Sequence, residues 1–198
     1  MSALAVEHVP ACGDDWDRLV HLWTEMDWPE GCKVEIIEGI ITVTPAPANR
    51  HNYIAAVTQR ALLAVLSEEW QVHQTLALAI PSRTALYIPD LVVVPTALLL
   101  ESGDEHFVPA AAAELAVEIT SKSSIRHDRM VKPAAYAHAG VPLYLLVDCF
   151  APGGPTITLY GEPKKDVYRV LQSGKFGETF HLPAPFGFDL DTSAFPTT

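Results

Sequence analysis

The spacing of apolar residues predicts a helix near the start of the chain. Four large apolar residues lie at i, i+3, i+4 and i+7, on one helical face: Trp16, Leu19, Val20 and Trp23. This helix should begin near Asp14 and end at Trp28-Pro29. Residues 1–13 have no such period, so we expect a flexible N-terminus followed by a single domain over residues 14–198.

Beyond this helix, apolar residues gather into short β-branched runs. Lys33–Val43 reads KVEIIEGIITV, two such runs around Glu38-Gly39, which predicts a β-hairpin. A helical apolar stripe then runs from Ile54 to Leu66, and Gln71–Ile80 alternates loosely, as a strand does. The runs Leu91–Val94 and Leu115–Ile119 have the length and composition of buried strands.

The second half of the chain continues with a helix and further strands. The helix should extend from about Asp128 to Ala139, and a buried strand follows at Leu143–Val147, before Asp148. A strand-helix-strand order implies a right-handed crossover with residues 115–119 and 143–147 parallel. Shorter strands near 156–160, 166–171 and 178–182 should form an antiparallel extension. The predicted fold is α/β (α+β), a mixed central sheet flanked by helices, with an N-terminal hairpin.

Composition limits the class of protein. The chain has 198 residues, of which 49% are hydrophobic and 19% charged, as in a globular protein. Its net charge of −11 disfavours broad charge-driven DNA binding, so a nucleic-acid enzyme of this kind would need a local basic patch. No apolar run is long enough to span a bilayer, and no signal peptide is evident, so we expect no membrane partner. Cys12, Cys32 and Cys149 form no CxxC motif, which indicates free thiols in a reducing cytoplasm.

Two acids accompany the buried strands. Asp90 comes just before the run Leu91–Val94, and Glu118 lies within Leu115–Ile119. A carboxylate in a buried strand costs several kcal/mol unless it is paired or binds a metal. Two such acids on neighbouring strands could share a hard cation such as Mg²⁺. Taken separately, Asp90 could cap a turn after Pro89 and Glu118 could pair with a lysine, but their joint placement favours a metal site.

Three segments taken together resemble a known family. The strings IPDLVVV, LAVEITSKSS and RHDRMVKPAAYAHAGVPLYLLVD are similar to the Uma2 family of the PD-(D/E)xK nuclease superfamily, over roughly residues 15–190. The resemblance implies a restriction-endonuclease-like fold and a metal-dependent endonuclease, a hydrolase of phosphodiester bonds. Its expected substrate is nucleic acid, DNA in the first place. Its expected cofactor is Mg²⁺ or Mn²⁺, bound by Asp90 and Glu118.

The catalytic lysine is displaced from its usual place. In the superfamily a lysine usually follows the second acid by two residues, but here that residue is Thr120. Such a lysine orients the attacking water and stabilises transition-state charge. The resemblance assigns the role to Lys132 on the next helix, with Lys122 as a second candidate. Lys132 could instead be an i to i+4 partner of Asp128, itself a natural helix N-cap.

The resemblance adds two further residues. Glu35 matches the first acid of the family's hairpin, and His51 lies at a helix start where the family tends to have a histidine. Both would line the site entrance or complete the metal shell. Glu35 could instead be a solvated strand-face carboxylate, and His51 a capping or surface residue.

Other functions compete with catalysis. A catalytically silent relative that binds nucleic acid or protein would suit the net charge of −11 and Thr120. An unrelated scaffold with salt-bridged acids is disfavoured by the combined motifs. A mean hydropathy of +0.17 and four tryptophans suggest self-association as a homodimer, with the Trp16/Trp23 helix as a candidate surface.

Overall fold

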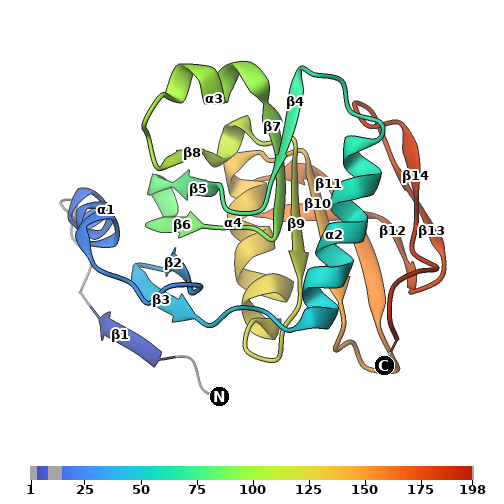
Figure 1. Ribbon diagram of the computed structural model, residues 1–198, viewed down its shortest axis with the longest axis horizontal. Helices are drawn as coiled ribbons and strands as arrows, with labels where there is room; N and C mark the ends of the chain where they lie inside the picture. The colour runs from blue at the N-terminus through green and yellow to red at the C-terminus, as the bar shows by residue number, and fades with distance from the viewer. Residues whose placement is uncertain (1–3, 9–14, 198) are drawn as a thin grey trace.

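Two six-stranded sheets and their helices form the molecule (Figure 1). The computed structural model describes residues 4–8 and 15–197. The first sheet has the order β1-β3-β2-β6-β5-β8 and is antiparallel apart from the β5–β8 pair. Its strands are β1 (Leu4–His8), β2 (Lys33–Ile37), β3 (Ile40–Thr44), β5 (Ala77–Ile80), β6 (Ala85–Tyr87) and β8 (Phe107–Pro109).

The second sheet is mixed. Its strand order is β12-β11-β10-β9-β7-β4. Strands β9 and β10 are parallel, with Leu115 opposite Leu143. The other neighbouring strand pairs in this sheet are antiparallel. Its strands are β4 (Trp70–His73), β7 (Leu91–Pro95), β9 (Leu115–Ile119), β10 (Leu143–Asp148), β11 (Thr156–Lys164) and β12 (Val167–Lys175). A separate hairpin joins β13 (Thr179–Leu182) to β14 (Phe188–Asp191). The predicted mixed sheet and its parallel strand pair are therefore confirmed.

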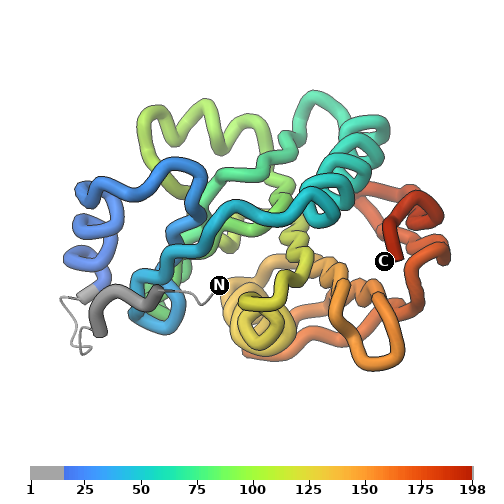
Figure 2. Tube along the Cα trace, turned by 60° about the horizontal axis from the view of Figure 1, so that its bottom comes forward, coloured from blue at the N-terminus to red at the C-terminus, as the bar shows by residue number. Residues whose placement is uncertain are grey.

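Helices cover both faces of the second sheet (Figures 1 and 2). The α-helices are α1 (Asp15–Glu25), α2 (Asn49–Leu63), α3 (Thr96–Ser102) and α4 (Lys132–Ala139), and a π-helical turn, His127–Val131, leads into α4. Side chains of β9 alternate between the faces: Val117 packs with α2, and Ala116 packs with α4. The β13–β14 hairpin adds Phe180 and Leu190 to the core on the α2 side. Within the described residues, no helix is long and apolar enough to cross a membrane.

The hairpin of β2 and β3 also has two different faces. Val34 and Ile36 pack against α1, whereas Ile37 belongs to the core shared with α4 and the second sheet. Because side chains alternate along a strand, Lys33 and Glu35 share the face of Ile37. The same alternation places Glu118 of β9 on the α4 side. The two sheets thus direct polar side chains toward one another around α4.

Several expectations from the sequence need correction. Residues 74–76 break the predicted strand Gln71–Ile80 into β4 and β5, which belong to different sheets. Strands β11 and β12 are longer than predicted, β13 begins one residue later than predicted, and the sequence analysis did not predict β14. Although we expected no regular structure in residues 1–13, Leu4–His8 pair with β3. The remaining residues of that segment lie outside the described part of the chain.

The Trp16/Trp23 face is not the free surface that the dimer prediction used. Both side chains pack against the first sheet, and the Trp16 ring meets Phe107 edge to face, with centroids 6.3 Å apart. Self-association therefore stays a prediction, without this surface to support it.

The start of α4 also differs from expectation. Asp128 is not an N-cap but is buried within the π-helical turn. The Lys132 N–H bonds to the His127 carbonyl, five residues back. Pro133, which has no N–H to donate, follows directly, so the irregular turn accommodates it.

Candidate active site

Buried charges converge where β2, β7, β9 and the start of α4 meet. The members of this carboxylate cluster are four acids and two lysines: Glu35, Asp90, Glu118, Asp128, Lys33 and Lys132. Four carboxylates and two ammonium groups give a formal charge of −2. Asp90 and Glu118 are only 8% and 1% exposed. The structure therefore brings together all three residues that the sequence predicted as the catalytic centre, Asp90, Glu118 and Lys132.

Asp90 is held at both carboxylate oxygens. Its Oδ2 accepts the Ile119 N–H at 2.8 Å and lies 2.9 Å from His51 Nε2. Its Oδ1 accepts a hydrogen bond from Lys33 Nζ at 2.6 Å. Burial would raise the pKa of Asp90, but the Lys33 ammonium and His51 hold it well below its usual range. Asp90 is thus a fixed carboxylate next to the strand that bears Glu118.

Lys132 is the central cation of the cluster. Its Nζ lies 2.9 Å from Glu35 Oε1, 3.0 Å from Glu118 Oε1 and 3.7 Å from Asp128 Oδ1. It also lies 5.7 Å from the centroid of the Tyr87 ring. Burial opposes its charge, but Glu118, Glu35 and Asp128 raise its pKa well above the ordinary value. The i to i+4 contact with Asp128 exists, but it is the longest of the three.

Two of the acids retain protons more strongly than usual. Burial raises the pKa of Glu118 to about 8 and that of Asp128 to about 6, even though Lys132 lowers both. The Tyr136 hydroxyl donates to Glu118 Oε1 at 3.0 Å. Asp128 Oδ1 is buried and has no hydrogen-bond partner among the described residues. The cluster thus has more acid than its own cations neutralise.

Glu35 and His51 are both parts of this network. Besides Lys132, Glu35 Oε1 accepts the Ile88 N–H at 2.9 Å, so it is not a solvated carboxylate. His51 does not cap α2, whose N-cap is Ala48 without a side-chain bond. Its ring is mostly buried, and Nδ1 has no hydrogen-bond partner among the described residues. Both residues lie where the sequence prediction needs them, although their roles stay predictions.

Comparison with known proteins identifies the family. The family model Uma2, described as "Putative restriction endonuclease", matches residues 22–193. The chain belongs to the Uma2 family. A solved structure described as a "putative nuclease belonging to DUF820 from Anabaena variabilis ATCC 29413" matches with a TM-score of 0.66 and 17% identity, over 87% of this chain and 94% of that one. This likeness confirms the predicted nuclease fold. A comparison with curated proteins finds no match.

The lysine candidates of this Uma2 protein lie in different surroundings. Lys122 is exposed and makes no ion pair or hydrogen bond with the described residues, whereas Lys132 is buried against Glu118. Thr120, which occupies the usual lysine position, accepts the Cys149 N–H at 2.9 Å and donates to Asp148 Oδ1 at 3.2 Å. Thr120 therefore ties the ends of β9 and β10 together.

Sequence reasoning missed Lys33 and Tyr136 and gave Asp128 only the roles of helix N-cap and i to i+4 partner of Lys132. Lys33 is the first residue of β2, two before Glu35, so the strand period alone puts both side chains on one face. Burial opposes the charge of Lys33, but Asp90 and Glu35 raise its pKa. No comparable sequence signal marks Tyr136, because an apolar helix face commonly includes tyrosine.

The carboxylate oxygens of the cluster differ in how far they are available to a divalent cation. Within residues 4–8 and 15–197, no three His, Cys, Asp or Glu side chains are arranged to hold a metal ion. Lys33 engages Asp90 Oδ1, and Lys132 engages Glu118 Oε1, whereas Glu118 Oε2 has no hydrogen bond with a described residue. Two carboxylates in a cluster of charge −2 are donors that Mg²⁺ and Mn²⁺ accept. Asp90 Oδ1 is available to such an ion only if Lys33 moves off it.

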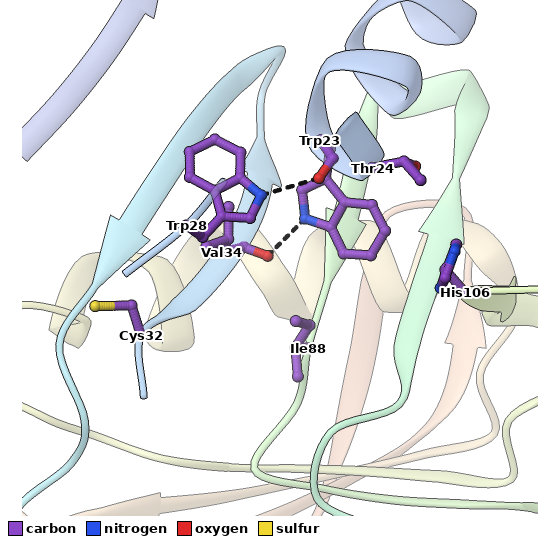
Figure 3. Close-up of a pocket in the computed structure, with 7 residues that line it drawn as sticks. All are labelled: Trp23, Thr24, Trp28, Cys32, Val34, Ile88 and His106. Atoms are coloured by element: carbon purple, nitrogen blue, oxygen red, sulfur yellow. Dashed lines mark hydrogen bonds between the residues drawn. The ribbon is translucent and has the colours of Figure 1, made fainter. Parts of the chain in front are cut away.

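The Uma2 chain also has a pocket that is separate from the cluster (Figure 3). It measures about 270 Å³, and its lining residues are Trp23, Thr24, Trp28, Cys32, Val34, Ile88 and His106. Trp23 Nε1 donates to the Val34 carbonyl at 2.8 Å, and Trp28 Nε1 donates to the Trp23 carbonyl at 2.9 Å. Val34 and Glu35 point to opposite faces of β2. The pocket therefore lies on the α1 side of the first sheet and is not the mouth of the carboxylate cluster.

Proposed function

We propose that this protein is a metal-dependent endonuclease that hydrolyses phosphodiester bonds in nucleic acid, with DNA as the expected substrate. The observation that carries the proposal is the contact of Lys132 Nζ with Glu118 Oε1 at 3.0 Å. This contact supports a role for a lysine that reaches the second acid from α4. The usual strand position for that lysine is occupied here by Thr120. Family membership supports the same reaction class.

The proposed roles follow from the contacts. Asp90 and Glu118 would hold Mg²⁺ or Mn²⁺, in keeping with the general use of divalent metals by restriction-endonuclease-like families. When bound, such an ion supplies a lower pKa for a coordinated water and screening of phosphate charge. Lys132 orients the water and stabilises the negative charge that develops on the phosphate. Glu35 and Asp128 keep Lys132 charged, and His51 fixes the Asp90 carboxylate.

A basic segment next to the cluster supports a phosphate-bearing substrate. On residues 121–131, Lys122 and Arg126 are exposed, whereas Arg129 is paired with Asp148 at 2.7 Å. Two exposed cations beside the cluster are the kind of local basic group that phosphate contacts require. A cytoplasmic location belongs to the same proposal and rests on the free thiols of Cys32 and Cys149.

A binding module without catalysis is the second candidate. The observation in its favour is that Lys33 already neutralises Asp90, while Glu118 is 1% exposed. Buried acids that are paired in this way can serve structure alone. Under this reading the basic segment would bind nucleic acid and no bond would be cleaved.

Cleavage assays distinguish the two functions. Single-stranded, double-stranded and branched DNA, and RNA, are incubated with Mg²⁺ or Mn²⁺ and wild-type protein, Glu118→Gln or Glu101→Gln. Glu101 is an exposed acid that makes no ion pair with the described residues, so Glu101→Gln is the matched control. Endonuclease function requires cleavage by wild type and by the control, and none by Glu118→Gln. Nucleic-acid binding without cleavage by wild type would favour the silent module.

A further inference from the structure

Lys33 already occupies the carboxylate oxygen with which Asp90 would bind a metal ion. Its Nζ is 2.6 Å from Asp90 Oδ1. The other oxygen, Oδ2, is already used by the Ile119 N–H and His51 Nε2. Oδ1 is therefore the oxygen at which one cation can be exchanged for another.

The two lysines of the cluster differ in their freedom to move. Lys132 contacts three carboxylates and has a side chain only 3% exposed, so it cannot leave without uncovering buried charge. Among the described residues, Lys33 forms an ion pair with Asp90 alone, and its side chain is 26% exposed. Its carbonyl accepts the Thr44 hydroxyl at 3.2 Å, which helps to hold the backbone while the side chain stays free to turn. Lys33 is therefore the cation that can give way.

An ammonium and a divalent cation repel each other strongly when they share one carboxylate oxygen inside a protein. We infer that Lys33 competes with the divalent cation for Asp90 Oδ1 and so sets the metal affinity of the site. The ammonium neutralises Asp90 in the metal-free protein and swings toward solvent when the cation binds. This inference rests on the proposed metal site, but not on cleavage.

Metal affinity tests this competition directly. Binding of Mn²⁺ is measured by electron paramagnetic resonance of the free ion, for wild type and for Lys33→Met, Lys33→Arg and Lys122→Met. Lys33→Met should bind Mn²⁺ about 10- to 100-fold more tightly, the factor expected from losing a competing charged hydrogen bond. Lys33→Arg keeps the cation and should stay near wild type. Lys122→Met removes the same charge from an exposed side chain and should also stay near wild type.

The outcomes separate this inference from the proposed function. Circular dichroism first establishes that each variant is folded. Equal Mn²⁺ affinity in wild type and Lys33→Met would overturn the competition while leaving the metal site intact. Equal tightening in Lys33→Met and Lys122→Met would also overturn it, because net charge alone would then explain the effect. No Mn²⁺ binding by any variant would overturn both the competition and the metal-dependent function.

Discussion

Lys132 contacts three buried carboxylates, so its replacement by Met should destabilise the fold. Methionine keeps most of the side-chain volume but removes the ammonium that contacts Glu35, Glu118 and Asp128. Removing one partner of a buried ion pair typically costs about 3–5 kcal/mol. For a chain of this length each kcal/mol lowers Tm by about 2–4 °C, so Lys132→Met should melt roughly 6–20 °C below wild type at pH 8.

The loss should depend on pH in a defined direction. Burial already raises the pKa of Glu118 to about 8, from 4.5, and that of Asp128 to about 6, from 3.8, with Lys132 present. Without the ammonium both pKa values rise further. The folded variant then holds protons that the unfolded chain releases, so its stability falls as pH rises. At pH 5 protons replace the lysine charge, and the loss should shrink by at least about 1.4 kcal/mol, the equivalent of one pKa unit.

Urea unfolding followed by circular dichroism measures this effect, in EDTA at pH 5 and pH 8. Lys122→Met is the control, because Lys122 is exposed and surface substitutions usually change stability by less than about 0.5 kcal/mol. A loss below about 1 kcal/mol for Lys132→Met at pH 8 would refute the argument, since it falls under the range for a broken buried pair. An equal loss at both pH values would refute the account of which acids titrate.

Three further predictions concern the same cluster. Asp90→Asn should lower Tm in EDTA, because it loses the charged hydrogen bond from Lys33; a higher Tm would instead mean that repulsion between the acids dominates. The free energy of unfolding of wild type in EDTA, measured with urea, should fall as pH rises from about 4.5 to 8, because the pKa of Glu118 is raised. Glu118→Gln should flatten this pH dependence. An unchanged slope in Glu118→Gln would assign the pH dependence to other groups. Lys132→Ala should reduce cleavage about 10²–10³-fold and retain Mn²⁺ binding, whereas Lys122→Ala should reduce cleavage much less; the reverse result would move the role to Lys122.

Local periodicity explains which elements could be predicted from sequence. The hairpin of β2 and β3 and the strands β9 and β10 have strong signals, because each is a short buried apolar run or has a Gly turn. The parallel pairing of β9 with β10 follows from the helix between them, by the handedness of crossovers. Gln71–Ile80 was misjudged because loose alternation does not show where a strand leaves one sheet for another.

The cluster itself depends on contacts between distant segments, and this limits what sequence could predict. Asp90, Glu118 and Lys132 could be named in advance only through the family resemblance and their places beside buried elements. The pairing of Lys33 with Asp90 joins residues 57 positions apart, and no local pattern encodes it. The sequence predicts Asp128 as an N-cap because its neighbours in sequence are polar. In the structure the helical turn begins before Asp128, and the Asp128 side chain is buried.

The π-helical turn directly precedes Lys132, the lysine on α4 that we propose acts in place of a strand lysine at position 120. A π-helical turn adds one residue to a helix, which rotates everything after it by about 100° relative to a regular α-helix. In this chain the rotation occurs between His127 and Lys132, directly before the side chain that must face Glu118. Pro133 favours the irregular turn, since it has no N–H for a regular bond to Arg129. Under the proposed assignment of Lys132, the departure at Thr120 and the irregular start of α4 belong to one arrangement, in which the helix would supply the lysine that the strand lacks.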